Sequence, residues 1–208
     1  MATGLCTPQP HLLHGRSHSA AARLPNGRVV CAGDFSLGLS STAKVWGPPD
    51  HGAQDAAWTW TEVSEMSVGR CGCRGRVLSD GRFPVLGGVA STGVGTTSSC
   101  EELTLGENRH WEPLPPVHDT RRDFACVAVA GCIIAAGGNH IAVEVYDEVL
   151  VGRWLRLSRN LPHIDYLRWR WAGYFCRQFV TRNCNQPTSK TCVNCACATT
   201  SWTCMYTF

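Results

Sequence analysis

The sequence has few charged residues and no apolar stretch long enough to cross a membrane. Charged side chains make up 17% of its 208 residues, against about 25% in typical soluble domains. The apolar run from Phe124 to Ala136 is interrupted by Gly131, and a membrane-spanning helix needs about 20 residues. We therefore expect no membrane association and few solvated helices.

The sequence also lacks the short motifs of common enzyme chemistries. It has no G-x-x-x-x-G-K phosphate loop, no G-x-S-x-G nucleophile elbow and no H-E-x-x-H zinc motif. The net charge of +3 is too small to predict nucleic-acid binding. No secretory apolar core follows Met1. The acid-free start is also typical of an organelle transit peptide, but the repeat described below uses the same residues. We expect a soluble cytoplasmic protein that is not an enzyme and carries no cofactor.

Cysteine, in contrast, is abundant, with 13 residues. Cys192 and Cys195 have the spacing of one half of a zinc site, but no second pair follows at the usual distance, so zinc binding by the tail stays open and we predict no metal site. Cys31, Cys126 and Cys132 lie within predicted strands, where cysteine acts as a small apolar residue. Because no secretory signal is present, a disulfide framework is not expected.

A glycine-ended hairpin occurs three times. Residues 123 to 138 read as two apolar strands that fold about Gly131 and end at Gly137 and Gly138. The same pattern spans residues 71 to 88 and residues 17 to 33. The turns of these two earlier copies, Asn26-Gly27 and Asp80-Gly81, suit the type I′ hairpin, which needs positive φ at both central residues.

Two further strands follow each hairpin. The third strands begin near Ala43, Glu101 and Val143, and the fourth strands begin at Trp60, Trp111 and Trp154. The glycine signals at positions 33, 87 and 137 are 54 and then 50 residues apart. Four-stranded repeats of this length are typical of β-propeller blades. The sequence thus predicts an all-β fold.

At these residues the chain resembles the kelch repeat family, over roughly Gly15 to Pro162. The matching features are the glycine pair, the Glu-Val-Tyr-Asp that ends at Asp147, the tryptophan that opens the fourth strand and the arginine before each unit. Asp34 replaces one glycine of the first pair, while Trp46 and Leu105 stand where a tyrosine is usual.

The resemblance implies an incomplete kelch-type β-propeller in residues 1–162, with blades at about 16–66, 67–116 and 117–162. The residues before Gly15 look like the end of a preceding blade. Propellers usually close with 4 to 8 blades, so we expect self-association or further blades to complete this one. Residues 163–208 form an irregular Cys-rich tail, whose composition is typical of disorder or of an altered reading frame.

Kelch propellers commonly hold partners on one face, formed by the loops between blades and the loops after the glycine pair. Carried over to this chain, the first set of loops contains Arg16, Arg70, Arg121 and Arg122, and the second contains Asp34, Ser91, Thr92, Asn139 and His140. The planar fork of arginine suits carboxylates, which favours an acidic or hydroxyl-rich peptide partner. The alternative, that these arginines cap or bridge blades, stays open.

The resemblance implies a protein-interaction module, such as a substrate-recognition adaptor of a ubiquitin ligase. The alternative is a kelch-propeller enzyme of galactose-oxidase or sugar-metabolite type. Glu101 and Glu102 are adjacent in a strand, so their side chains face opposite ways and cannot share one proton. We expect both to lie on a solvated edge.

Overall fold

The computed structural model describes residues 8–12, 14–49, 56–93, 95–106, 108–129, 131–147 and 152–157. These residues form fifteen β-strands and no helix, so the all-β prediction is confirmed. Within the same ranges, no helix has the length and apolar character needed to cross a membrane. The predicted tail, residues 163–208, lies outside the described part of the chain, and so does its Cys192–Cys195 pair.

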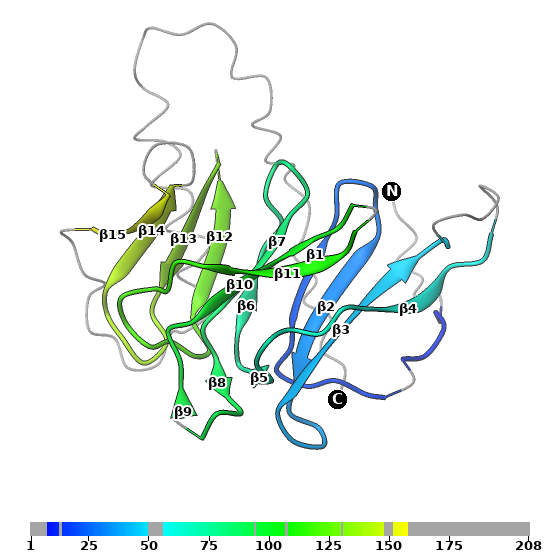
Figure 1. Ribbon diagram of the computed structural model, residues 1–208, viewed down its shortest axis with the longest axis horizontal. Coiled ribbons are helices and arrows are strands. Elements are labelled where there is room, and N and C mark those ends of the chain that lie inside the picture. Colours follow the sequence, from blue (N-terminus) through cyan, green and yellow to red (C-terminus); the bar gives the residue numbers. More distant parts are fainter. Residues whose placement is uncertain are drawn as a thin grey trace, which may run out of the picture.

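Three antiparallel four-stranded sheets follow one another along the chain (Figure 1). The first sheet contains, in order, β1 (Ala20–Arg23), β2 (Val29–Asp34), β3 (Ser40–Gly47) and β4 (Thr59–Val63). The second contains, in order, β6 (Arg74–Gly75), β7 (Phe83–Leu86), β10 (Cys100–Thr104) and β11 (His110–Leu114). The third contains, in order, β12 (Ala125–Val129), β13 (Cys132–Ala136), β14 (Val143–Asp147) and β15 (Arg153–Arg156).

A small fourth sheet was not predicted. It consists of β5 (Arg70–Cys71), β8 (Val89–Ala90) and β9 (Gly95–Thr96). Gly72 has a φ of +61°, which is a left-handed conformation that interrupts an extended strand. The innermost strand of the second unit is therefore split, and β5 pairs with β8 while β6 pairs with β7.

The first two hairpin turns differ from the type I′ prediction. Gly27 and Gly81 have φ values of +86° and +93°, but neither Asn26 nor Asp80 has a positive φ. Each turn is a three-residue loop in which the glycine N–H donates to the carbonyl three residues earlier. The cause is local: the Asn26 and Asp80 side chains each accept from the N–H two residues on, at 3.1 Å and 3.0 Å.

Apolar side chains fill the two spaces between successive sheets. Val30 and Val45 from the first sheet pack with Phe83 and Leu103 from the second. A second cluster joins the second sheet to the third through Leu86, Cys100, Phe124, Ile133 and Trp154. The sheets are thus held together face to face by burial of apolar surface.

The fourth-strand tryptophans tie each sheet to the segment before it. The indole Nε1 of Trp111 donates to the carbonyl of Ser64 at 2.7 Å, and that of Trp154 donates to Pro115 at 2.8 Å. Trp60 donates in the same way to Pro10 at 3.1 Å. Residues 8–12 therefore occupy the place that the preceding connection occupies in the later sheets.

The residue opposite each tryptophan shows where the tyrosine position lies. Tyr146 pairs with Trp154 in register, with ring centroids 5.4 Å apart. Trp46 pairs with Trp60 as expected, but Leu103 pairs with Trp111. Leu103, and not Leu105, therefore stands at the tyrosine position. Leu105 follows Thr104, the last residue of β10, and so lies beyond the residues that pair with β11.

Candidate interaction face

The loops that follow the glycine signals lie at one end of the sheets, along the lower edge of Figure 1. Strands β2, β7 and β13 end at this edge. The segments that lead into the following units lie at the same edge, because antiparallel neighbours reverse direction at every turn. We call this end the loop face and the opposite end, which carries the tight turns, the hairpin face. All nine sequence-predicted site residues belong to segments at the loop face.

Three of the predicted arginines make the same contact in successive sheets. Arg16, Arg70 and Arg121 each donate from Nη1 to the carbonyl at the glycine signal of their own unit, at 3.0, 3.1 and 3.0 Å. The acceptors are Gly33, Gly87 and Gly137. This repeated bond joins the entering segment to the end of the second strand.

Each of these arginines also binds the third-strand region of its unit. Arg121 donates from Nη2 to Glu144 at 2.7 Å, and Arg70 forms the corresponding ion pair with Glu101. The first sheet has Lys44 at the position of these glutamates, where it pairs with Glu62 at 3.1 Å. Arg16 accordingly donates to the carbonyl and hydroxyl of Thr42.

Burial separates these arginines from the surface. Arg70 and Arg121 are 0% exposed, and Arg16 is half-buried. A guanidinium that is enclosed and bonded within its own unit has no surface to offer to a partner. Arg70 and Arg121 therefore cap their own units, as one part of the alternative allowed, and the candidate site does not include them.

Glu101 and Glu102 do not lie on a solvated edge as expected. They are 4% and 5% exposed, because Glu101 pairs with Arg70 while Glu102 pairs with Arg82 at 2.6 Å. Glu101 also accepts from the N–H of Ser67 at 2.7 Å. The two side chains do bind different partners, and each is buried with a partner of opposite charge.

The pKa of Glu144 shows how such a carboxylate is held. Burial acts to raise its pKa, but bonds from the His118 N–H, the Arg121 guanidinium and the His118 ring outweigh burial and lower the pKa below the ordinary 4.5. The His118 N–H donates at 2.7 Å. Hydrogen bonds and an opposite charge favour the ionised form, so Glu144 is ionised at neutral pH.

Backbone contacts between successive sheets require glycine at the signals. A Cβ on Gly33 would lie 2.4 Å from the carbonyl oxygen of Arg70, and one on Gly87 would lie 2.5 Å from that of Arg121. Both glycines also have positive φ. The signal of one unit thus packs directly on the arginine backbone of the next unit.

A line of backbone hydrogen bonds continues this contact across the three units. The N–H of Gly72 donates to His18 at 2.8 Å, and the N–H of Asp123 donates to Gly72 at 2.9 Å. His18, Gly72 and Asp123 have φ values of 55°, 61° and 51°. Left-handed backbone at the same position of every unit, including two non-glycine residues, indicates that this junction is a constrained part of the repeat.

Two of the predicted site residues hold the loops in shape. Asp34 is 8% exposed, and its Oδ1 accepts from the N–H of Ser17 at 2.7 Å and from the N–H of Ser36 at 3.0 Å. Asn139 Oδ1 accepts from the N–H of Arg122 at 3.1 Å in the third unit. These side chains cap the entering segment, and Asn139 is also exposed to solvent.

The remaining predicted residues are exposed on the loop face. They are Arg122, Ser91, Thr92 and His140. Arg122 and His140 belong to the third unit, whereas Ser91 and Thr92 lie in the turn between β8 and β9. These side chains are accessible to a partner, although the His140 ring also lies 3.9 Å from the Asp119 carboxylate. The prediction that they bind a partner remains a proposal.

Exposed apolar residues of the same loops were missed by the sequence reasoning. Phe35 is 55% exposed, Leu37 is 90% exposed and Ile141 is 46% exposed. The Phe35 ring meets His18 edge to face, with centroids 6.3 Å apart. The signal was available in the sequence, because Phe35 and Leu37 follow directly on a glycine signal, in a loop where polar residues are usual.

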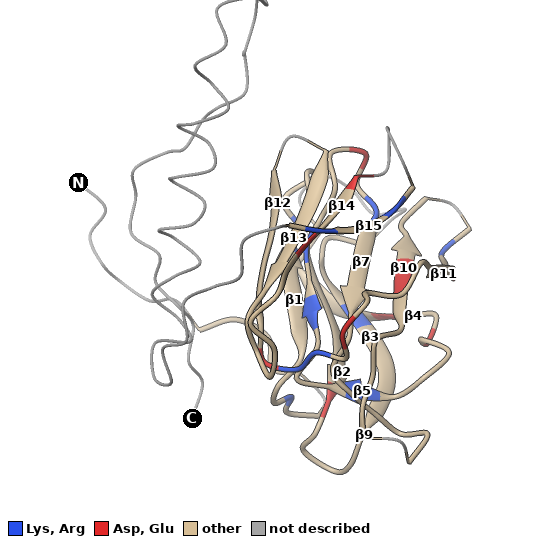
Figure 2. Ribbon diagram, turned by 90° about the vertical axis from the view of Figure 1, so that its left-hand side faces the viewer, with Lys and Arg blue, Asp and Glu red and all other residues tan. Residues whose placement is uncertain are grey.

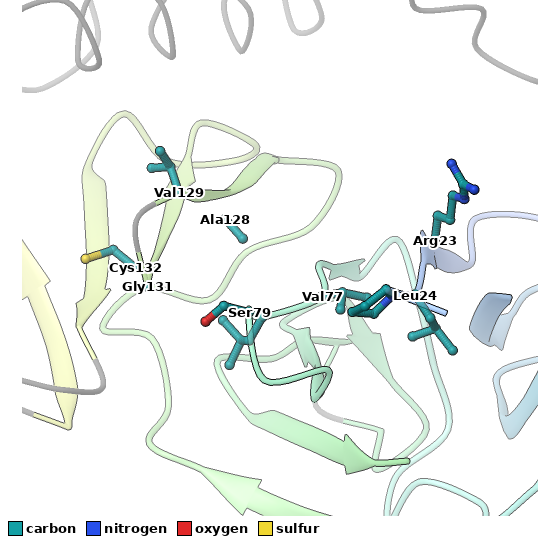
Figure 3. A pocket seen from close by; sticks show the side chains of 10 residues that line it. Arg23, Leu24, Val77, Ser79, Ala128, Val129, Gly131 and Cys132 are labelled. Carbon is teal, nitrogen blue, oxygen red and sulfur yellow. The ribbon is translucent and has the colours of Figure 1, made fainter. Parts of the chain in front are cut away.

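The hairpin face carries a separate hollow of about 550 Å³. It is bordered by turn and strand-end residues of all three units, among them Arg23, Leu24, Ser79 and Val129 (Figure 3). None of the nine predicted site residues lines it. Among the residues that the structure describes, no group of three or more His, Cys, Asp or Glu side chains could hold a metal ion.

Comparison with known proteins identifies the fold. No family model matches the sequence, and no curated protein matches it. The solved structure of YjhT, a β-propeller protein, is similar to this chain with a TM-score of 0.60 and 13% sequence identity. The match covers 74% of this chain and 54% of YjhT, so the chain spans about half the length of that structure. The three sheets are therefore β-propeller blades, as the repeat predicted.

Proposed function

We propose that this chain is a protein-interaction module of kelch type whose loop face binds a partner polypeptide. The observation that carries the proposal is the group of exposed apolar side chains, Phe35, Leu37 and Ile141, on the loops after the glycine signals. Apolar side chains left in water at one end of a rigid scaffold are characteristic of an interaction surface. The repeated arginine and glycine contacts beneath supply the rigidity.

The charges around these residues suggest the partner's chemistry. Arg122 and His140 are exposed in the same unit as Ile141, and His18 contacts Phe35 in the first unit. A partner polypeptide with apolar anchors could bury them against the exposed apolar side chains, and an acidic group near those anchors could pair with Arg122. The kelch resemblance extends the proposal to cytoplasmic adaptors, such as the substrate-recognition component of a ubiquitin ligase.

Affinity capture followed by binding measurements on variants tests the proposal. Leu37→Ser and Ile141→Ser each remove an exposed apolar anchor. We expect either variant to bind the captured partner at least about tenfold more weakly, since such anchors contribute more than about 1.4 kcal/mol to the binding free energy. Pro25→Ser is the matched control, because Pro25 is exposed in the tight turn between β1 and β2, at the opposite end of the sheets. Equal affinity for all four proteins would overturn the proposal.

A further inference from the structure

The first sheet has an open face whose counterparts in the other sheets are covered. Val29, Trp46 and Trp60 stand in register across β2, β3 and β4. The same positions hold Phe83, Leu103 and Trp111 in the second sheet, and Ile133, Tyr146 and Trp154 in the third. In these two later sheets the positions pack against the preceding sheet.

Exposure shows that the first of these faces lacks its neighbour. Phe83 and Leu103 are 0% exposed, whereas Val29 and Trp46 are only half-buried. They border a hollow of about 710 Å³ together with Trp58, which is 36% exposed. Residues 8–12 already fill the place of the preceding connection, so within the described part of the chain what this face lacks is a sheet.

The third sheet carries an apolar face on its far side. Its half-buried members are Val127, Val129, Val145 and Leu157, which follows β15 directly; Ile134, Ala136 and Val143 lie between them and are 2%, 8% and 0% exposed. Strands β12 and β13 contain no charged residue, as the view onto this sheet shows (Figure 2).

This far face matches, position by position, the face with which the first sheet covers the second. Strand pairing places Val127, Ile134 and Val145 where the first sheet has Ala22, Val30 and Val45. The remaining members correspond to Leu24, Ala32, Ala43 and Val63, and all seven of these pack in the cluster that contains Phe83. The third sheet therefore has the surface needed to cover a face like that of Val29, Trp46 and Trp60.

We propose that two copies of this chain complete one propeller between them. The far face of the third sheet of each copy covers the open face of the first sheet of the other, so that two equivalent junctions close a ring with two-fold symmetry. Six four-stranded sheets fall within the usual 4 to 8 blades. The lengths agree, because the matched part of one copy corresponds to 54% of YjhT. This inference is independent of the proposed function, since the two faces that form the junctions do not include the exposed loop residues Phe35, Leu37 and Ile141.

Charge complementation between two variants tests the proposal. Val29→Lys places a charge on the open face of the first sheet, and Val145→Glu places the opposite charge on the far face of the third. Their counterparts, Phe83 and Val45, belong to one cluster in the existing junction. Light scattering should give twice the single-chain mass of 22.7 kDa for the wild type. Each variant alone should give the single-chain mass, because a charge is buried without a partner.

The equimolar mixture decides the outcome. It should return to twice the single-chain mass, because one junction then pairs lysine with glutamate and the other is unaltered. Circular dichroism of each variant checks that it is folded. A wild type with single-chain mass, variants that still dimerise alone, or a mixture of folded variants that stays monomeric would each overturn the proposal. Leu37→Ser should keep the wild-type mass, so loss of partner binding and loss of dimerisation can be told apart.

Discussion

Replacing Arg121 by alanine should remove a large part of the stability of the third blade. Arg121 donates to Glu144 from Nε at 3.1 Å and from Nη2 at 2.7 Å, and it donates to Gly137 at 3.0 Å. Both members of the ion pair are 0% exposed. The substitution leaves a buried carboxylate without its cation, which costs about 3 to 5 kcal/mol. Domains are stable by only about 5 to 15 kcal/mol.

Urea unfolding followed by tryptophan fluorescence measures this loss, since Trp154 belongs to the same blade. The matched control is Arg156→Ala: its guanidinium pairs with Asp119, but its side chain is 52% exposed, so we expect a loss below about 1 kcal/mol. In the double variant with Glu144→Gln, the cost of Arg121→Ala should shrink, because no buried charge is left unpaired. Equal losses for Arg121→Ala and Arg156→Ala would refute the reasoning.

Three further predictions follow from the same contacts. Gly33→Ala should lower the free energy of unfolding by about 1 to 3 kcal/mol, because its Cβ would lie 2.4 Å from the Arg70 carbonyl oxygen at a φ of +78°. Gly106→Ala has open space around it and should change that free energy by less than about 0.5 kcal/mol. Thermal melts in which Gly106→Ala is the less stable variant would count against the contact. Hydrogen bonds and Arg121 outweigh burial and lower the pKa of Glu144, so its contribution to stability is complete above about pH 4.5 and is lost as the pH falls through the lowered pKa. Between pH 6 and pH 3 the free energy of unfolding should therefore fall less steeply for Glu144→Gln than for the wild type. Parallel curves for the two proteins would contradict this. Burial raises the pKa of Cys73, Cys100 and Cys126 to about 11, about 12 and about 11. Iodoacetamide at pH 8 should therefore label the half-buried Cys132 before these three, as peptide mass mapping would show. Equally fast labelling of all four thiols would contradict the burial of Cys73, Cys100 and Cys126.

The fold could be predicted because the same physical requirements recur in each of the three repeats. Each glycine signal must leave room for a neighbouring backbone, and each fourth-strand tryptophan must reach the carbonyl of the preceding connection. Residues such as Gly87 and Trp111 therefore recur at fixed positions and can be recognised in the sequence. The turn type was missed because the Asn26 side chain binds the Arg28 N–H and fixes a different loop. Such competition between side chain and backbone cannot be read from a dipeptide alone.

The candidate site was harder to predict because arginine has two opposite uses. The sequence places Arg70 and Arg122 on equivalent connections of two units, but only the structure shows that Arg70 is enclosed with Glu101 while Arg122 is exposed. The charged partner lies about 30 residues away in the sequence, on another strand. The exposed apolar residue Leu37 was overlooked because a lone leucine in a loop also suits a buried anchor.

Hydrogen exchange of the protein with and without its captured partner tests the central claim most directly. The account predicts that the partner slows exchange in the loops after the glycine signals, at residues 35–39 and 139–142, and leaves the tight turns at 24–28 and 78–82 unchanged. Protection of those turns, with exchange in the loops unaltered, would contradict it.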